Sequence, residues 1–417
     1  MKNRRNLYLA VFALLHAFIF LVIFKNGIYR SFAETDISIP YLYASKMALG
    51  QMPYRDFAVE YPPLALFFML IPRLFTSFAN PYILGFTLEI LLFDLLAVFL
   101  IISLSQKLEL SLWKSLAVYT LALLSIGPLI INRYDLIPAV MALGAVYAFT
   151  CGRSNIAWAL LAAGAMTKIF PVVIAPVFLI FDLACCRSRR ALTGSVTFAL
   201  TTAVIALPFL IMSPRGFLES FTYHTQRGLQ IESIPASLLL LGQKLGLTTL
   251  TIEHASGATN VVSPLANALA NITPILVLIS LAAVYWFYYR RQRAMRVDSG
   301  PVGDLNRAQT ACLIGFSLLA MLAFMLSSKV LSPQFIIWLA PLIPLVTGRF
   351  SRLSWLLFIA AGLMSYLIFP TGYQTLEDGD ARMIAILLAR NAALFGLALA
   401  VARSACDRED YLRLRAD

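Results

Sequence analysis

Charged residues are scarce in this 417-residue chain, in which Asp, Glu, Lys and Arg together make up 13%. A soluble domain carries about 25%. The mean hydropathy of +0.80 is correspondingly high. The shortage of charge excludes a soluble enzyme with a single anchor and predicts a polytopic membrane protein.

Residues that build metal sites and disulfide frameworks are few as well. The chain has 5 cysteines, none with CxxC spacing, and 3 histidines. No Asp-rich or His-rich ligand set accompanies them. We therefore expect free thiols, no metal site and no cofactor.

Internal repeats and low-complexity segments are not evident, and we expect no cleavable leader. The apolar run 7–24 follows basic residues, but no small-residue cleavage site comes after it, so we interpret it as a retained first span. The basic residues behind the net charge of +12 are scattered through short loops, which argues against nucleic-acid binding. We expect residues 1–417 to form a single membrane domain.

Apolar runs that are long enough, or nearly long enough, to cross a bilayer recur along the whole chain. We predict an all-α polytopic membrane fold of about 12 transmembrane helices. Their expected positions are 7–24, 83–104, 113–131, 136–150, 156–168, 171–184, 191–212, 265–289, 308–327, 333–347, 353–370 and 384–403. Several are short and bounded by Pro or Gly, which indicates broken helices that face protein or a watery cavity.

Basic residues predict the orientation of these spans, since cytoplasmic loops are rich in Lys and Arg. The short loops "CCRSRR" (185–190) and "YYRRQRAMR" (288–296) carry the strongest clusters. They place both termini on the cytoplasmic side of a plasma or inner membrane. The long loops 25–62 and 213–263 then lie on the outer, periplasmic or extracellular side, and loops of such length are often functional.

Two segments near the first long loop are expected to lie on the outer membrane surface. "ISIPYLYASKMALG" (37–50) places its apolar residues on one helical face and ends plausibly at Gly50. "PPLALFFMLIPRLF" (62–75) is too short to span straight, although a short true span stays an alternative. A span there would flip every later segment and put "CCRSRR" outside, against the charge rule.

Three acids of the first loop compete for the role of a catalytic base, namely Asp36, Asp56 and Glu60. A carboxylate can deprotonate an incoming hydroxyl. Asp36 is equally suited to cap the helix that follows it, and its chemistry alone leaves both interpretations open. Asp56, Glu60 and the adjacent Tyr61 precede a Pro-Pro hinge and are candidates for substrate contact.

Four cations fall at breaks between spans or in the second long loop, all near one outer level of the predicted topology. They are Arg133, Lys168, Arg227 and Lys329. A lysine near a helix end can snorkel to the interface, and Arg133 can pair with Asp135, which is itself a candidate for substrate contact. Arg and Lys also bind phosphate, and a charge at membrane depth costs about 2.5–3.5 kcal/mol on insertion scales.

Further polar candidates come from "FTYHTQRGLQIES" (221–233), which contains His224 and Glu232, and from "SSKVLSPQ" (327–334), which ends in Gln334. A solvated loop is the simplest interpretation of the first of these. Convergence of cations and carboxylates favours group transfer from a lipid phosphate, because charge builds on the phosphate as its bond breaks. Glu89, Asp94 and Arg390 lie inside predicted spans, where we expect polar neighbours and assign no function.

Three segments in their order resemble the GT-C superfamily of integral-membrane glycosyltransferases. They are "TDISIPYLYASKMALGQMPYRDFAVEYPPLALFF", "NRYDLIPAVMALGAVYAFTCGRSNIAWALLAAGAMTKIFPVVIAPVFLI" and "LSPQFIIWLAPLIP". Within it, the chain resembles glycosyltransferase family 87, the polyprenyl-phosphate-mannose-dependent mannosyltransferases. The features shared over roughly 30–345 are the acid ahead of the first-loop helix, the G-x-x-P-Y…YPP hinge, the R-[YF]-D turn, the K-x-[YF]-P break and the SPQ turn.

The resemblance implies about a dozen transmembrane helices, with juxtamembrane helices in the first outer loop. It implies a polyprenyl-phosphate sugar donor, a lipid-linked or glycan acceptor, inversion at the anomeric carbon and no metal. Asp36 matches the catalytic base of the family, and Lys168 and Arg133 match positions near the donor phosphate. The second long loop departs from the mannosyltransferase pattern.

A lipid or glycan transporter is the alternative function, since it would also line a cavity with cations. Such transporters favour inverted repeats and gates on both faces. This chain has no evident repeat, and its predicted topology gathers the polar groups at one face.

Overall fold

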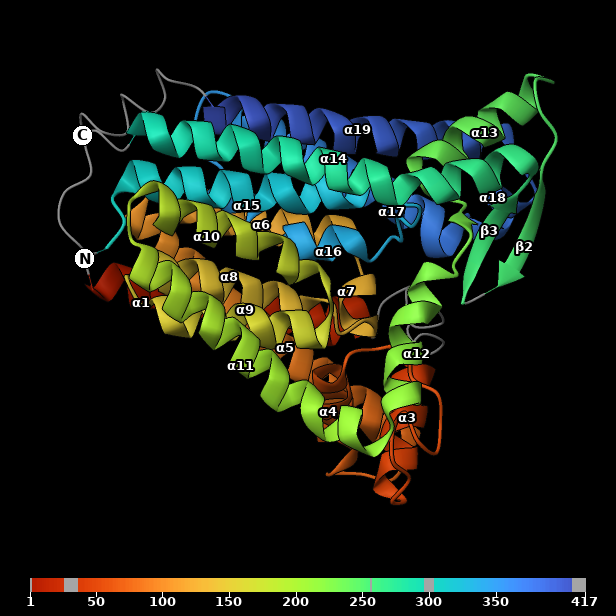
Figure 1. The fold of residues 1–417 in the computed structure, drawn as a ribbon, viewed down its shortest axis with the longest axis horizontal. Coiled ribbons are helices and arrows are strands. Elements are labelled where there is room, and N and C mark those ends of the chain that lie inside the picture. Colours follow the sequence, from red (N-terminus) through yellow and green to blue (C-terminus); the bar gives the residue numbers. More distant parts are fainter. Residues whose placement is uncertain (1, 26–36, 256, 296–303, 407–417) are drawn as a thin grey trace.

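The computed structural model describes residues 2–25, 37–255, 257–295 and 304–406. Long helices lie side by side in a bundle (Figure 1). The chain enters this bundle through α1 and leaves it through α19 at one end. Short helices and a small sheet cover the opposite end.

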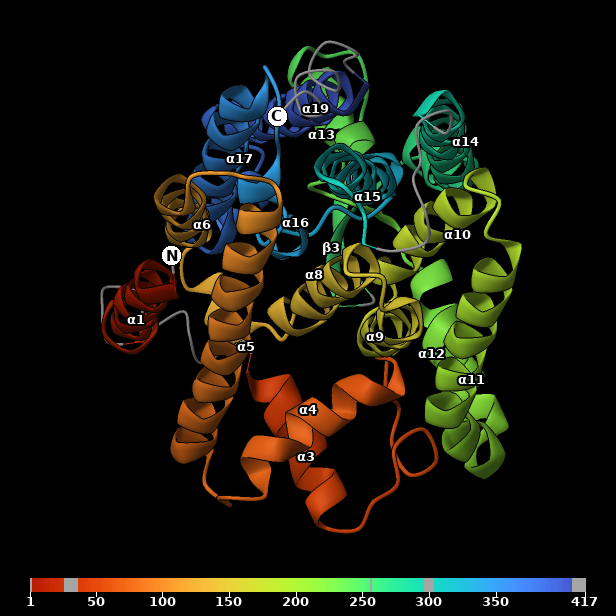
Figure 2. The same cartoon turned by 90° about the vertical axis from the view of Figure 1, so that its left-hand side faces the viewer.

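Among the described residues, seven helices are long and apolar enough to cross a membrane by length and composition. They are α1 (Lys2–Phe18) with η1 (Ile19–Phe24), α5 (Ala79–Lys107), α11 (Ser188–Met212), α14 (Pro264–Met295), α15 (Arg307–Ser327), α17 (Ser351–Tyr366) with η5 (Leu367–Thr371), and α19 (Ala381–Cys406). This confirms a polytopic, mostly helical membrane protein. Viewed from the end that holds the termini, α8 and α15 lie inside the bundle, whereas α1, α11 and α14 lie at its edge (Figure 2).

The other five predicted spans are helical but short. They are α6 (Leu112–Ile126) with α7 (Leu129–Asn132), α8 (Leu136–Thr150), α9 (Ser154–Thr167), η2 (Phe170–Ile174) with α10 (Ala175–Ala184), and α16 (Phe335–Leu339) with η4 (Ile343–Leu345). A straight span needs about 20 residues. The total of twelve spans therefore stays a prediction.

Two helix breaks have clear local causes. Helix α6 ends where Gly127 adopts φ +70°, a conformation that favours glycine, and Pro128 then starts the short α7. Helix α9 ends where Lys168 takes an extended backbone (φ −155°, ψ 134°), two residues before η2 begins. The expected break at Lys168 is confirmed, whereas the break at Gly127 divides a segment, 113–131, that we predicted as one continuous span.

The first long loop contains α3 (Ser38–Ala48) and is followed by α4 (Pro63–Arg73), and the two helices pack on each other. Helix formation was expected for both. The N-cap residue Ile37 and Ala44 of α3 are buried, but the C-cap residue Leu49 is 78% exposed. The apolar face of α3 thus rests partly on the protein itself. Whether α3 and α4 lie on a membrane surface stays a prediction.

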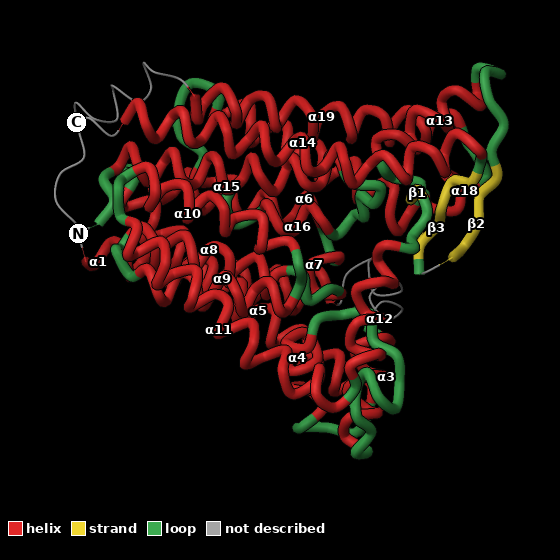
Figure 3. Tube along the Cα trace, in the orientation of Figure 1, coloured by secondary structure: helices red, strands yellow, loops and turns green. Residues whose placement is uncertain are grey.

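The second long loop contains α12 (Pro214–Thr225), α13 (Ile234–Lys244) and three strands, β1 (Leu229–Gln230), β2 (Thr251–Ala255) and β3 (Ala258–Val262). The strands form an antiparallel sheet in the order β1-β3-β2 at the end opposite the termini (Figure 3). The all-α prediction is wrong here. The runs on both sides of Gly257 contain β-branched residues, a pattern that is typical of a hairpin.

Polar residues inside the bundle have partners from neighbouring helices. Asp94 of α5 accepts hydrogen bonds from His16 of α1 (2.6 Å) and from the Tyr119 hydroxyl of α6 (2.8 Å), and all three residues are fully buried. Arg390 of α19 is equally buried and pairs with Glu232 at 3.1 Å. These contacts confirm that Asp94 and Arg390 pack against polar groups. The Glu89 carboxylate has no hydrogen-bond partner among the described residues.

Candidate functional site

A cavity of about 1100 Å³ opens at the end of the bundle that carries the short helices and the sheet. Its walls come from the start of α3, the Tyr61–Pro62 hinge, the breaks after α7 and α9, α12, the sheet, α14, and the turn before α16. Segments from almost the whole chain therefore meet here. The helix breaks expose polar backbone groups and polar side chains to the cavity. A continuous apolar helix would keep its backbone groups hydrogen-bonded within the helix.

All four predicted phosphate-binding cations line this cavity. Lys168 donates to Asp135 Oδ1 at 2.6 Å, and its ammonium lies 5.0 Å from the centre of the Tyr134 ring. Lys329 donates to the carbonyl oxygen of Thr225 at 2.7 Å. The cations come from four separate segments, so the tertiary fold concentrates positive charge where an anion can be held.

Asp135 organises the wall behind Lys168. Its Oδ1 accepts from both Lys168 and the Trp338 indole N–H, each at 2.6 Å, and the side chain is fully buried. Its Oδ2 and the neighbouring Tyr134 hydroxyl are buried and have no hydrogen-bond partner among the described residues. Such groups are costly to leave unpaired. Both belong to residues that line the cavity, which makes them candidates for contact with a substrate.

The acids of the first loop separate in the structure. Glu60 and Tyr61 line the cavity, and the Glu60 carboxylate accepts a hydrogen bond from the Tyr43 hydroxyl. Asp56 is not among the cavity residues; it pairs with Arg55 at 2.8 Å and accepts from the Met52 N–H at 2.8 Å. The hydrogen bond from Arg55 lowers the pKa of Asp56 to about 2. Asp56, which we expected as a candidate for substrate contact, therefore lies outside the cavity lining.

Asp36 lies outside the described residues. The helix that follows it begins at Ser38 with Ile37 in the N-cap position. Ile39 and Pro40, in the first turn of that helix, line the cavity.

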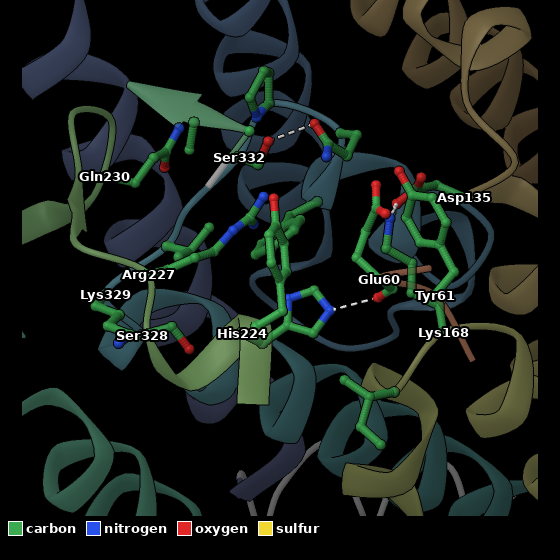
Figure 4. Close-up of a pocket in the computed structure, with 18 of the residues that line it drawn as sticks. Glu60, Tyr61, Asp135, Lys168, His224, Arg227, Gln230, Ser328, Lys329 and Ser332 are labelled. Atoms are coloured by element: carbon green, nitrogen blue, oxygen red, sulfur yellow. Dashed lines mark hydrogen bonds and ion pairs between the residues drawn. The ribbon is translucent and has the colours of Figure 1, made fainter. Parts of the chain in front are cut away.

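The second long loop supplies His224 and Glu232 to the cavity, and the turn before α16 supplies Gln334. His224 Nε2 lies 2.9 Å from the Glu60 carbonyl oxygen (Figure 4). Burial lowers the pKa of His224 below 6.5, so the ring is neutral at pH 7 and donates its Nε2–H to that carbonyl. Burial raises the pKa of Glu232 to about 7, although its partner Arg390 opposes the change.

Several cavity residues carried no signal in the sequence. Gln230, Thr259 and Tyr373 line the cavity together with Trp338. Tyr373 belongs to a short helix, α18 (Tyr373–Glu377), that follows the last but one long helix. Polar or aromatic residues of this kind are common in any loop, so only the fold identifies them.

The chain matches glycosyltransferase family 87 over residues 59–305, more than half of its length. The chain belongs to glycosyltransferase family 87. It is therefore a glycosyltransferase, which acts on a sugar donor and an acceptor, and the GT-C resemblance is confirmed at this level. A comparison with curated proteins found no match.

The matched range of family 87 covers much of the cavity but not all of it. Glu60, Arg133, Lys168, Arg227 and Glu232 fall within residues 59–305. The cavity residues outside the match come from the start of α3, the end of α15, the turn before α16, α16 itself, η5 and α18. In this member of family 87 the site thus includes a wall that the family match does not account for.

Proposed function

We propose that this protein is an inverting hexosyltransferase that uses a polyprenyl-phosphate donor, with mannose as the sugar. The acceptor is a lipid-linked or glycan hydroxyl, and the reaction takes place on the outer face of the membrane. The observation that carries the proposal is the cavity in which Arg133, Lys168, Arg227 and Lys329 meet buried carboxylates. Membership of family 87 supports the sugar-transfer chemistry itself.

The four cations would hold the donor phosphate. As the bond between the anomeric carbon and the phosphate oxygen breaks, the electron pair stays on that oxygen and the lipid phosphate gains negative charge. Preformed cations in a site shielded from water stabilise this developing charge. The apolar residues Val277 and Leu278 of α14 and Phe324 of α15 line the same cavity and would contact the first part of the polyprenyl chain.

Asp36 would act as the base. It would take the proton of the acceptor hydroxyl while the acceptor oxygen bonds to the anomeric carbon, opposite the departing phosphate. A single displacement of this kind inverts the anomeric centre. The assignment is supported by the place of Asp36 in the chain, three residues before Ile39, which lines the cavity.

The test uses purified protein with a radiolabelled polyprenyl-phosphate mannose and extracted membrane glycolipids as acceptors. We expect Asp36→Asn to lower turnover at least about 100-fold, which is the usual contribution of a general base. Asp56→Asn is the matched control, because Asp56 pairs with Arg55 away from the cavity and should retain activity. Near-normal turnover of a well-folded Asp36→Asn protein would refute the base assignment.

The same assay separates the enzyme from a transporter. Detergent solution has no membrane to cross, so consumption of donor and appearance of labelled product there require catalysis. Binding of donor without any product would favour the transporter. We propose further that residues 1–417 form one transmembrane domain with both termini in the cytoplasm, which puts the cavity on the outer side.

A further inference from the structure

The start of α11, at the end of the bundle that holds the termini, carries a group of charges that the proposed reaction does not use (Figure 1). The group consists of Asp182 near the end of α10 and of Arg187 and Arg190 at the start of α11. We call these three residues the arginine cluster. None of them lines the cavity, which lies at the opposite end of the bundle.

Both arginines of the cluster lie against the protein. The Arg190 guanidinium lies 4.6 Å from the centre of the Phe149 ring and pairs with Asp182 at 3.2 Å, and its side chain is only 14% exposed. Arg187 is half-buried, whereas its neighbour Arg189 is exposed. The general preference for basic residues in cytoplasmic loops requires no such burial. The arginine cluster therefore needs a further explanation.

The cluster has unused hydrogen-bonding groups and an excess of positive charge. Arg187 Nη1 and Arg190 Nε are buried and have no hydrogen-bond partner among the described residues, and the two carboxylate oxygens of Asp182 accept no hydrogen bond from them. Buried polar groups usually have a partner, which can be an ion or a water molecule. Two guanidinium groups face one carboxylate, and the positive end of the α11 helix dipole adds to them. This combination suits an anion whose oxygens accept hydrogen bonds from arginine.

Apolar surfaces beside the cluster indicate that the anion belongs to a lipid. Helix α10 packs against both α11 and α14, and it lies between them when the bundle is viewed from the end that holds the termini (Figure 2). In the most apolar part of α11 0% of the residues are buried, and in that of α14 17% are. Leu183, four residues before Arg187, is 49% exposed. Acyl chains can therefore cover this face of the protein next to the cluster.

The end of α14 has the residue types of a membrane–water interface. Trp286 is 58% exposed, and its ring lies 6.2 Å from the Tyr289 ring. The Arg293 guanidinium lies 5.7 Å from the centre of the same Tyr289 ring. Aromatic and basic residues together are typical of the depth of lipid headgroups. The buried Tyr288 of this segment interacts electrostatically with Asp182, so the arginine cluster lies at the same depth.

We propose that the arginine cluster binds the phosphate headgroup of an anionic phospholipid, in the leaflet on the side of the termini. Arg187 donates hydrogen bonds to the phosphate, and Arg190, held by Asp182 and Phe149, keeps the site positive. The acyl chains lie along the exposed face of α10. This site is independent of the proposed sugar transfer, and it does not depend on which side of the membrane the termini occupy.

Lipid titration of the purified full-length protein, followed by native mass spectrometry, tests the inference. The probes are phosphatidylglycerol and phosphatidylcholine with identical acyl chains. We expect phosphatidylglycerol to bind at least about 5-fold more tightly, and Arg187→Gln to weaken its binding about 5-fold, the usual contribution of one arginine near an anionic lipid. Arg189→Gln is the matched control, since it removes the same charge from an exposed position of the same segment. It should weaken binding less than about 2-fold, because solvent and salt screen an exposed charge.

Equal binding of the two lipids overturns the inference, and so do equal losses in Arg187→Gln and Arg189→Gln, which a diffuse positive surface would produce. If Arg187→Gln fails to fold, Arg187→Lys replaces it with Arg189→Lys as its control, because lysine keeps the charge but lacks the planar fork of arginine. Arg187→Lys should then weaken phosphatidylglycerol binding more than its control does, and equal binding by these two variants would again contradict the site.

Glycerol 3-phosphate distinguishes a lipid from a free anion at this site. It should compete with phosphatidylglycerol at least about 100-fold more weakly than a second phospholipid does, because it has no acyl chains to bury. Competition at similar concentrations would overturn the assignment to a lipid.

Discussion

Lys168 shows how one residue can serve both the fold and the site. It donates to Asp135 at 2.6 Å, and Asp135 is fully buried. The same lysine lines the cavity. A buried ion pair adds little stability by itself, but removal of one partner leaves an uncompensated charge.

Lys168→Met should therefore destabilise the protein by about 3–5 kcal/mol, because the buried Asp135 loses its ion-pair partner and keeps only the hydrogen bond from Trp338. The double variant Lys168→Met/Asp135→Asn should recover much of this loss. The measurement is chemical or thermal unfolding in detergent. Arg55→Met, which breaks the exposed pair with Asp56, is the control and should change stability little. A double variant that is no more stable than Lys168→Met would contradict the pairing argument.

Glu232 makes stability depend on pH in a predictable direction. Burial raises its pKa from 4.5 to about 7 in the folded protein. The folded state therefore holds this proton more tightly than the unfolded chain, and stability falls as pH rises from about 4.5 to about 7. The full change corresponds to about 3 kcal/mol.

Melting curves of wild type and Glu232→Gln between pH 4.5 and 7.5 test this. The stability of wild type relative to the variant should decline across that range and then level off. Glu219→Gln, at an exposed position of α12, is the control for the loss of one carboxylate. A wild-type advantage that instead grows with pH would mean that attraction to Arg390 outweighs burial, contrary to the expected sign.

At the level of elements, helix breaks decide where the site residues point. The end of α6 at Gly127 and the short α7 carry the chain into the turn that holds Arg133 and Asp135. Gly127 has φ +70° and ψ −153°, a region essentially restricted to glycine. A Cβ there would also meet the Tyr366 ring at 3.2 Å.

Gly127→Ala should destabilise the protein by about 1–3 kcal/mol because of this backbone strain. It should also weaken donor binding, since the strained turn leads into the cavity wall. Gly144→Ala is the matched control: it lies within α8, and its Cβ would make an ordinary 3.5 Å contact with Leu160. That variant should be neutral or slightly more stable. Unfolding experiments measure the stability of each variant, and donor titration measures its affinity for the donor. Equal stability and equal donor affinity of Gly127→Ala and Gly144→Ala would contradict the inference that the break at Gly127 positions the cavity wall.

The elements were unevenly predictable. Apolar runs identified the helices, because burial in lipid or in a helix bundle demands long unbroken apolar stretches whatever the rest of the chain does. The sheet was missed, because its three strands are 2, 5 and 5 residues long. Strands this short are stabilised by pairing between segments of the loop and not by a strong local pattern.

For the whole molecule, the arrangement of the two ends predicts a sidedness. The start of α11 lies at the end that holds the termini, and α13 lies at the cavity end (Figure 1). Leu247, just after α13, is 78% exposed, and Cys186, just before α11, is also exposed. Basic loops on the side of the termini support a cytoplasmic location for that end.

A membrane-impermeant maleimide should therefore label Leu247→Cys in intact cells, while Cys186 should react only after the membrane is permeabilised. The double variant Leu247→Cys/Cys186→Ser lacks the thiol at position 186, so a comparison with Leu247→Cys alone separates the labelling at position 247 from the labelling at position 186. Labelling of Cys186 in intact cells, with Leu247→Cys protected, would reverse the proposed topology and put the cavity on the cytoplasmic side.

The sequence by itself determined the membrane class, most helices and the break at Lys168, because hydropathy and backbone preference are local properties. It also singled out Arg133, Lys168, Arg227 and Lys329, since charges near apolar spans are costly and stand out. Their gathering in one cavity followed from the expected topology.

Only the tertiary structure decided which acidic residues lie in the cavity with these four cations. Asp56 forms an ion pair with its neighbour Arg55, whereas Glu60, four residues later in the chain, lines the cavity. Glu232 meets Arg390, which is 158 residues away in the chain, and Thr259 donates to Glu377 across 118 residues. No local pattern encodes such contacts, because their partners become neighbours only when distant helices and strands pack together.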